Sequence, residues 1–276
     1  MIQEIQNAFS IDVEDFFHGK AFHYVSSADW MYIEGSVDKN VKIILEMLYK
    51  SNTKITFFFL GWIADNYPTL VREAEKAGHE IASHGYWHKL NIETSKTLYE
   101  DIRKSKESIE DIIGKPVYGL RLPNFGNFQI GEWFFDIIEN AGYLYDSSLY
   151  PTYHDWYKWN KNTRRPHRVR PRLFEIPMSS IRVRDFDVPM GGGGYLRLLP
   201  ASLFIKGISI LNRQFIPANL YMHPHDIDQN SPMPRSMMKK LRRKIRIGNS
   251  LSKVEHILNS FHFGRMVDLI PMSIRD

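Results

Sequence analysis

Short apolar segments alternate with segments of helical periodicity through the first half of the chain. The apolar segments are predicted strands and lie at residues 8–13, 54–60, 79–83, 117–120 and 144–146. Between them, apolar side chains recur at helical spacing in residues 37–50, 68–77, 95–113 and 132–140. Strands that alternate with amphipathic helices favour a parallel sheet covered by helices. The repetition therefore predicts an α/β fold, built as a barrel or as a doubly wound sheet.

The chain has the length and composition of one globular catalytic domain. Of its 276 residues, 43% are hydrophobic and 24% are charged, which allows a sizeable buried core. We expect a single domain over residues 1–276, with the motifs in a core at about 5–230 and a basic, helical C-terminal segment at about 231–276. No internal repeat or low-complexity linker divides the sequence.

The sequence contains no cysteine. Disulfides, thiolate metal ligands and a cysteine nucleophile are therefore excluded, and any metal must be held by histidines and carboxylates. The N-terminus lacks the basic start and apolar run of a secretory signal, and no apolar segment reaches the roughly 20 residues that cross a bilayer. We therefore expect a cytoplasmic protein.

Positive charge is concentrated near the C-terminus. The formal net charge is only +5, yet six of the eight residues in 239–246 are Lys or Arg. One interpretation of this segment is a solvated helix face. The other is a contact with a lipid-linked or acidic glycan or a membrane surface, which would place the protein at the periphery of the inner membrane. Nucleic acid is a weaker interpretation, because no recognition motif accompanies the basic run.

Three carboxylates follow the first predicted strand. Asp12, Glu14 and Asp15 come at the end of an apolar run, where such groups are not buried without partners. A metal ion would neutralise one or two of them. Alternatively, they cap the next helix and interact with the positive end of its dipole.

Two histidines and an arginine lie near later strands. His84 and His88 are four residues apart in SHGYWH, so on a helical turn both imidazoles would project from one face at metal-binding spacing. Arg121, in RLPNF, can hold a carboxylate through two hydrogen bonds or form a surface ion pair.

A further histidine ends a late predicted strand. His223, in YMHPHD, can transfer protons near neutral pH. A core or supporting histidine is the alternative for His223, and the stronger interpretation for His225.

Together these residues predict hydrolysis of an acyl bond by water that a metal activates. A bound divalent metal lowers the pKa of water from about 15.7 toward about 7 and polarises the carbonyl. In this interpretation Asp12 is the general base, Arg121 orients it, and His223 protonates the leaving nitrogen.

Four motifs carry a family resemblance, in the order SIDVED, SHGYWH, RLPNF and YMHPHD. They resemble the motifs of the polysaccharide deacetylases that share the NodB homology domain, carbohydrate esterase family 4. Longer stretches of the chain resemble one subgroup, which is associated with bacterial exopolysaccharide and exosortase gene systems. These stretches are FFFLGWIADNYPTLVREAEKAGHEIASHGYWH, YDSSLYP, GGGGYLRLLP and FHFG. The resemblance covers nearly the whole chain, and the ordered set is far more specific than any one motif.

The resemblance implies a distorted (β/α) barrel of the NodB type and removal of acetyl groups from an N-acetylated hexosamine. The substrate would be a bacterial polysaccharide or its lipid- or nucleotide-linked precursor. A divalent metal is implied, with zinc expected and cobalt, nickel or iron as alternatives. The matching motifs imply Asp12 as catalytic base, held by Arg121, and His223 as general acid. They also imply His84 and His88 as metal ligands.

The chain departs from the family's pattern near the implied metal site. The usual adjacent Asp pair is replaced by Asp12-Val-Glu-Asp15, so the third metal ligand is either Glu14 or Asp15. Strand periodicity favours Glu14, whereas a loop would free Asp15. Gly85 stands where a Ser or Thr usually follows the first metal histidine, and its presence removes a hydroxyl that could support His84.

Substrate contacts are predicted in the loops that follow the strands. His225 and Asp226 stand where the subgroup commonly has Trp and Glu, an exchange expected to alter these contacts. The predicted substrate-binding residues are Pro123, Phe125, Asp146, Tyr150, Trp156, Gly193 and Tyr195. Backbone N–H groups near Tyr150 or in the glycine run 191–194 are candidates for an oxyanion site. Stacking on sugar rings, or plain packing, is expected of Trp156, Tyr157, Trp159 and Tyr195.

Two other interpretations compete with a sugar deacetylase. An amidohydrolase acting on a small non-sugar amide such as a ureide would share the fold, but the intact His84 and His88 count against it. A catalytically silent glycan-binding or scaffolding protein would have lost at least one residue of the site. The intact set of candidate residues argues against that interpretation.

Overall fold

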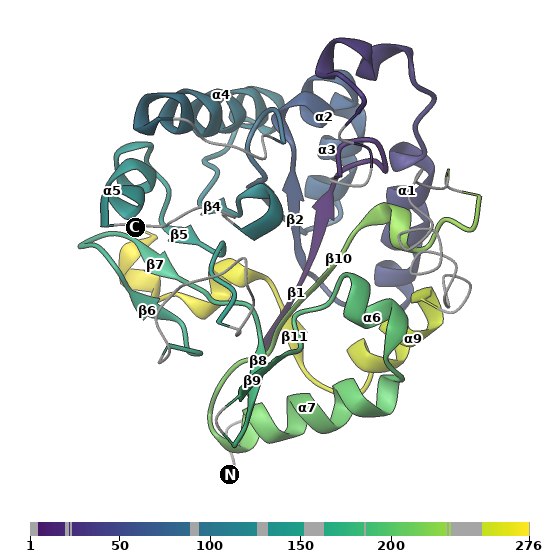
Figure 1. Cartoon of the computed structure of the whole chain (residues 1–276), viewed down its shortest axis with the longest axis vertical. Coiled ribbons are helices and arrows are strands. Elements are labelled where there is room, and N and C mark those ends of the chain that lie inside the picture. The colour runs from purple at the N-terminus through teal and green to yellow at the C-terminus, as the bar shows by residue number, and fades with distance from the viewer. Residues whose placement is uncertain are drawn as a thin grey trace.

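The protein, described here by a computed structural model, folds around one curled sheet with helices on its outer side (Figure 1). The structure describes residues 5–19, 22, 24–88, 94–125, 132–151, 163–184, 186–230, 232 and 250–275. The predicted α/β class and barrel-like architecture are confirmed. The basic segment 239–246 lies outside the described residues, so the basic C-terminal helix stays a prediction.

The main sheet is parallel except at one edge, where β6 pairs antiparallel with β7. Its strands run in the order β10-β1-β2-β3-β4-β5-β7-β6, and β11 pairs with β1 beside β2. The strands are β1 (Asn7–Val13), β2 (Thr56–Phe59), β3 (Glu80–Ser83), β4 (Gly119–Leu120), β5 (Tyr145–Asp146), β6 (His167–Arg168), β7 (Phe174–Glu175), β10 (Asn219–Met222) and β11 (Phe263–Gly264). A separate hairpin is formed by β8 (Ser180–Val183) and β9 (Phe186–Pro189).

Helices cover the convex face of the sheet. They are α1 (Val37–Lys50), α2 (Gly61–Asn66), α3 (Pro68–Lys76), α4 (Ser95–Ile113), α5 (Glu132–Asn140), α6 (Gly194–Leu198), α7 (Ala201–Arg213) and α9 (Ser250–Leu258). Shorter 3-10 turns are η2 (Ser27–Tyr32), η3 (Pro123–Phe125), η4 (Pro224–Asp226), η6 (Met266–Leu269) and η7 (Met272–Ile274). The predicted bounds of α1, α4 and α5 match the structure. For α4 the local cause is visible, because Thr94 caps its first turn and Gly114, at φ 66°, ends it.

β1 is buried along its whole length because both of its faces pack against hydrophobic side chains. Alternate side chains pack in the large core that includes the helices: Phe9, Ile11 and Val13. The other face of the strand, at period two, carries Ala8, Ser10 and Asp12. Ala8 belongs to a small inner cluster with Phe58 of β2 and Met266 of η6. Polar residues of β1 therefore face the inside of the barrel.

The C-terminal segment fills the barrel at the end where its strands begin. Within η6, the N–H of Met266 donates to Thr56 Oγ1 (2.8 Å), and that of Val267 donates to Glu80 Oε2 (3.0 Å). The hydroxyl of Tyr145 donates to the other oxygen of Glu80 (2.9 Å). Because this end is filled, the opposite end, where the strands finish, remains for a functional site.

The segment after β7 closes the gap between the two sides of the sheet. Ser179 N–H donates to the carbonyl of Asn219 in β10 (3.2 Å), and Asn219 N–H donates to Ser179 Oγ (2.7 Å). The glycine run then passes along the same strand. At Gly192, where φ is 130°, an added Cβ would lie 1.9 Å from the carbonyl oxygen of Tyr221, so glycine is required there. Among the described residues, none of the helices combines the length and apolarity needed to cross a membrane.

Candidate active site

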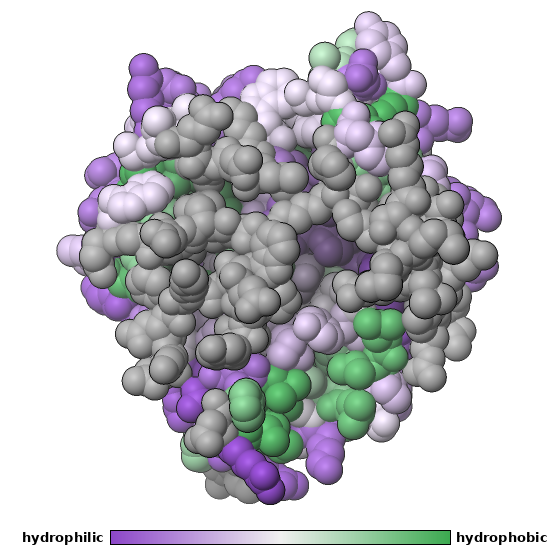
Figure 2. Space-filling view, in the orientation of Figure 1, coloured by the Kyte–Doolittle hydropathy of each residue, from purple (hydrophilic) through white to green (hydrophobic). Residues whose placement is uncertain are grey.

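Side chains from the carboxyl ends of four strands converge at the open end of the barrel. Asp12 and Glu14 lie at the end of β1, and His84 and Arg121 directly follow β3 and β4. His223 follows β10, which lies beside β1. Neighbouring parallel strands carry their carboxyl ends at one edge, which is where ligand sites form in such sheets. In Figure 2 hydrophilic atoms lie at the floor of a hollow near the centre of the face shown.

The Asp12–Arg121 pair is the most deeply buried part of the site. Arg121 Nη1 donates to Asp12 Oδ1 and to Ser10 Oγ, both at 2.7 Å. Its other nitrogens contact the carbonyl of Ser147 (3.3 Å), Ser147 Oγ (3.1 Å) and Asn219 Oδ1 (3.5 Å). A guanidinium with no exposed surface must be paired and hydrogen-bonded in this way. Arg121 therefore fixes one oxygen of Asp12.

Beside this pair, Glu14, His84 and His88 form a buried group whose ligand atoms lie within 4.8 Å of one another. Glu14 Oε2 faces His88 Nε2 in an ion pair. His84 Nδ1 lies 2.8 Å from the carbonyl oxygen of Arg121. Because a carbonyl only accepts, Nδ1 carries the proton and Nε2 of His84 keeps its lone pair. Such a hydrogen bond to the second ring nitrogen is how metal-binding histidines are usually oriented.

The charge state of this group suits a divalent cation. Burial lowers the pKa of His84 to about 4, so its imidazole is neutral at physiological pH. Burial opposes ionisation of Glu14, but the charge and hydrogen bond of His88 hold the pKa of Glu14 well below its usual value. A carboxylate with two imidazoles is a donor set that zinc and similar cations accept. The residues present therefore fit a metal ion.

The His84–His88 pair does not lie on a helical turn, and that expectation was wrong. Residues 84–88 form a loop after β3, in which Gly85 has φ 71° and His88 has φ 48°. Backbone in the left-handed region cannot continue a right-handed helix. The loop is held instead by Asp101 of α4, which accepts hydrogen bonds from the N–H groups of Tyr86 (2.8 Å) and Trp87 (3.3 Å).

Asp15 points away from this group. Its Oδ2 accepts hydrogen bonds from the N–H groups of Ser36 (2.7 Å) and Val37 (2.9 Å) at the start of α1, and its Oδ1 accepts from Phe16 N–H (2.8 Å). Burial nevertheless raises the pKa of Asp15 above its usual value. The cluster at the end of β1 thus combines both sequence interpretations, since Asp15 caps a helix while Glu14 lies beside His84 and His88.

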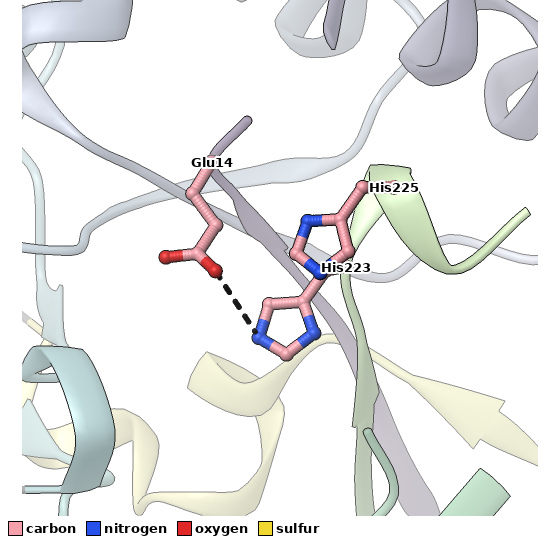
Figure 3. A group of neighbouring side chains, drawn as sticks. All are labelled: Glu14, His223 and His225. Atoms are coloured by element: carbon pink, nitrogen blue, oxygen red, sulfur yellow. Dashed lines mark ion pairs between the residues drawn. The ribbon is translucent and has the colours of Figure 1, made fainter. Parts of the chain in front are cut away.

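His223 lies beside the carboxylate of Glu14 (Figure 3). Its Nε2 is 3.6 Å from Glu14 Oε1, and its Nδ1 is 3.1 Å from Asp226 Oδ2. Asp226 is fully buried and forms an ion pair with Arg197 of α6. Burial lowers the pKa of His223, with the charge of Glu14 acting in the opposite direction. His223 is therefore held by one carboxylate and faces another.

Several predicted substrate contacts line the same end of the barrel. Phe125, Tyr150 and Tyr221 form a buried cluster, in which the Phe125 ring lies 5.3 Å from Tyr150 and 4.9 Å from Tyr221. Pro123, in η3, is buried, and Tyr195 on α6 is 37% exposed. Trp156, together with Tyr157 and Trp159, lies outside the described residues.

Two of the suggested oxyanion donors in the glycine run are already engaged within the protein. The N–H of Gly191 donates to Tyr150 Oη (2.9 Å), and the N–H of Gly193 donates to the carbonyl of Tyr221 (3.0 Å). The geometry therefore gives no support to these two amides as oxyanion donors.

Asp146 does not join the site. The residues on either side of it, Tyr145 and Ser147, point into the barrel, whereas Asp146 accepts a hydrogen bond from Ser148 Oγ (2.7 Å) and lies opposite Glu175 of β7. Burial raises the pKa of Asp146 to about 6. Burial and the charge of Asp146 raise the pKa of Glu175 well above its usual value. Buried side by side, the two carboxyl groups cannot readily both ionise.

This pair leads to a pH-dependent prediction. Carboxyl groups with raised pKa values stabilise the fold below their unfolded pKa of about 4, and that contribution is lost as the pH rises through about 6 and above. Glu175→Gln removes one titrating group, so we expect the variant to exceed wild type in unfolding free energy by about 1–3 kcal/mol at pH 8. The difference should shrink toward pH 4.

Urea unfolding of both proteins across this pH range measures the effect of the pair, because titrating groups away from Asp146 and Glu175 cancel in the difference. Glu34→Gln, at an exposed position, is the control and should show no such trend. A Glu175→Gln protein less stable than wild type at pH 8 would contradict the prediction.

Sequence reasoning missed residues that support the site from a distance. Ser10 contacts Arg121, and Asp226 contacts His223. Arg197 forms an ion pair with Asp226, and Asn219 contacts Arg121. Period two along β1 would have placed Ser10 on the same face as Asp12. No local pattern connects Arg197 with Asp226, which are 29 residues apart in sequence.

Comparison with known proteins finds a family model that matches the first half of the chain. Residues 29–143 match the model of the polysaccharide deacetylase family, and residues 147–271 match a domain of unknown function, DUF3473. The chain is 31% identical over 117 residues to peptidoglycan-N-acetylglucosamine deacetylase of Bacillus cereus, covering 38% of this chain and 42% of that protein. It is 24% identical over 253 residues to peptidoglycan deacetylase of Helicobacter pylori, covering 83% of this chain and 76% of that protein.

The fold gives the same result. A Mycobacterium smegmatis structure, described as that of a polysaccharide deacetylase, covers 98% of this chain and 90% of its own, with a TM-score of 0.60 at 21% identity. The open barrel is therefore the NodB-type fold of carbohydrate esterase family 4. Residues 29–143 thus match the polysaccharide deacetylase family, and the chain is similar to proteins of that name in sequence and in fold. It spans less than half of the Bacillus cereus relative, of which 42% is matched.

Proposed function

We propose that this protein removes N-acetyl groups from an N-acetylated hexosamine with the help of a divalent metal ion. One observation supports this proposal most strongly. A buried Asp–Arg pair, a Glu–His–His group and a histidine that contacts a carboxylate meet at one end of the barrel. Similar proteins bear the name peptidoglycan-N-acetylglucosamine deacetylase. The match to DUF3473 supports the exopolysaccharide-associated subgroup, hence a polysaccharide or its lipid- or nucleotide-linked precursor as substrate.

In this proposal Glu14, His84 and His88 hold the metal, which is zinc, with cobalt, nickel or iron as alternatives. Glu14 is favoured over Asp15 because the Asp15 oxygens already accept backbone hydrogen bonds. When bound, a divalent cation lowers the pKa of water and polarises an acyl carbonyl. The arrangement leaves the neighbouring Asp12 and His223 for proton transfer.

Asp12 acts as the general base. Arg121 binds its Oδ1, so the carboxylate is held in a fixed orientation and its other oxygen can accept a proton. His223 acts as the general acid. Because Asp226 holds its Nδ1, the Nε2 atom is the one that can deliver a proton to the leaving nitrogen.

Mass spectrometry of N-acetylglucosamine oligosaccharides incubated with the protein tests the proposal. We expect one acetyl group to be lost per modified sugar, with release of free acetate. A chelator should abolish the reaction, and added zinc or cobalt should restore it. His84→Gln should bind less metal and lose turnover under the same conditions. Turnover that survives both the chelator and His84→Gln would overturn the metal-dependent mechanism.

A substrate panel tests the class of substrate separately. Ureides and simple amides, supplied with zinc, should remain intact while the acetylated sugars react. The opposite pattern would favour an amidohydrolase of the same fold. Glycan binding without turnover or bound metal would instead favour a silent binding protein. Cytoplasmic location and a lipid or membrane contact through residues 239–246 remain predictions, and fractionation of cells would test them.

A further inference from the structure

We propose that a second divalent cation binds between Glu14, His223 and His225 and inhibits the enzyme. This site shares Glu14 with the group formed by His84 and His88, and the inference about inhibition rests on the proposed function of His223. The ligand atoms of Glu14, His223 and His225 all lie within 4.8 Å of one another. Figure 3 shows the two imidazoles together on one side of the Glu14 carboxylate.

Glu14 can serve both sites because its two oxygens face different histidines. Oε2 faces His88 Nε2, whereas Oε1 lies 3.6 Å from His223 Nε2. A carboxylate with this arrangement can bridge two cations, as in the paired metal sites of many hydrolases. The negative charge of one carboxylate, together with neutral imidazoles, is the donor set that borderline divalent cations prefer.

The two histidines of the second site are held side by side. Their rings are stacked, with centroids 4.8 Å apart and an interplanar angle of 9°. The buried carboxylate of Asp226 lies next to both, with Oδ2 3.1 Å from His223 Nδ1 and Oδ1 3.9 Å from His225 Nε2. A carboxylate hydrogen-bonded to the second ring nitrogen orients a metal-binding imidazole, as Asp226 does for His223, and the ion pair with Arg197 keeps Asp226 in place.

A cation can reach this position with little rearrangement. Zinc–ligand bonds of about 2.1 Å place the donors of a tetrahedral ion about 3.4 Å apart, so small side-chain rotations are sufficient. Both histidine side chains are partly exposed, at 20% for His223 and 14% for His225. A cation can therefore enter from solvent, and ligands from solvent can complete its coordination.

Occupation of the second site interferes with proton transfer. While His223 Nε2 is bound to a cation, it has no lone pair for a proton and cannot deliver one to a leaving amine. The cation held by Glu14, His84 and His88 supports turnover, whereas the second cation stops it. Excess zinc is therefore inhibitory in this protein, and His225 is the residue that confers the inhibition.

Metal counting tests the second site without any use of enzymatic activity. Wild-type protein, first stripped of metal, is dialysed against rising zinc concentrations and its bound zinc is counted. We expect two ions per chain in wild type and one in His225→Gln. The double variant His84→Gln/His88→Gln should also bind one. His256→Gln, which removes an exposed histidine of α9, is the control and should bind two.

Two ions in His225→Gln, or only one in wild type, would overturn the second site. Loss of the fold is checked by circular dichroism, and His225→Asn provides an independent variant that must give the same count as His225→Gln. Because zinc is the only probe, this count stands even if the protein proves not to be a deacetylase.

Inhibition is tested by a ratio within each protein. Deacetylation in excess zinc is divided by deacetylation with one equivalent of zinc. The ratio should fall well below one in wild type and in His256→Gln, and should return toward one in His225→Gln. A ratio that falls equally in His225→Gln would show that zinc inhibits elsewhere and would overturn the inhibitory role.

Discussion

Asp12→Asn is expected to lower kcat for amide hydrolysis by about 10²- to 10⁴-fold, the contribution typical of a positioned general base. Asn has almost the same shape as Asp, and its Oδ1 can still accept the hydrogen bond from Arg121 that now measures 2.7 Å. What the variant loses is the carboxylate that accepts a proton from the attacking water in the proposed reaction. The effect should therefore appear in kcat rather than in KM, and steady-state kinetics on an acetylated oligosaccharide measures both.

Two further measurements separate a loss of base from a loss of structure. Bound zinc should stay at the wild-type value in Asp12→Asn, because Glu14, His84 and His88 remain. Asp38→Asn, at the exposed end of an ion pair with Lys42, is the matched control and should keep wild-type kcat. If Asp12→Asn also kept wild-type kcat, Asp12 would not be the base.

Arg121→Met is expected to lower the unfolding free energy by about 3–5 kcal/mol. Methionine fills much of the same volume but leaves the Asp12 carboxylate buried without its cation. It also removes hydrogen bonds to Ser10 and Ser147 and the contact of the guanidinium with the Phe58 ring, 4.3 Å away. A buried charge without a partner is among the most destabilising changes that one substitution can make. Urea unfolding at neutral pH measures the loss.

Two other arginine variants calibrate this result. Arg103→Met removes an exposed ion pair with Glu107, at 2.9 Å, and should change stability by no more than about 1 kcal/mol. Arg121→Lys keeps the charge but cannot reproduce the forked contacts, so it should fall between wild type and Arg121→Met. An Arg121→Met protein as stable as wild type would mean that the buried pair does not stabilise the fold.

The parts of the site that lie on regular strands could be predicted from the sequence. Asp12 lies in β1 and Glu14 follows its last residue, so strand periodicity favours one face for both, and the structure has Glu14 beside His84 and His88. Helix bounds were predictable for a related reason. Apolar spacing together with a cap such as Thr94 and a terminator such as Gly114 is local information.

Features that depend on distant contacts could not be predicted in the same way. The four-residue spacing of His84 and His88 is compatible with a helix, and only the backbone angles of Gly85 and His88 place the pair in a loop. Likewise, nothing near Asp226 in the sequence indicates that Arg197 pairs with it. Such contacts join residues that are distant in the sequence, and they produce no periodic pattern of residue types from which they could be predicted.

The central position of β1 in the sheet limits how much of the sheet can form while the chain is being synthesised. β1 is translated before the other strands of the sheet, yet it pairs with residues 219–222 of β10 and with Phe263 and Gly264 of β11. A nascent chain that has left the ribosome only as far as β9 cannot complete either pairing. Contacts across such long sequence separations form slowly. During synthesis, therefore, the edge of β1 that pairs with β10 remains open to chaperones, or to unwanted pairing with other chains, until β10 emerges.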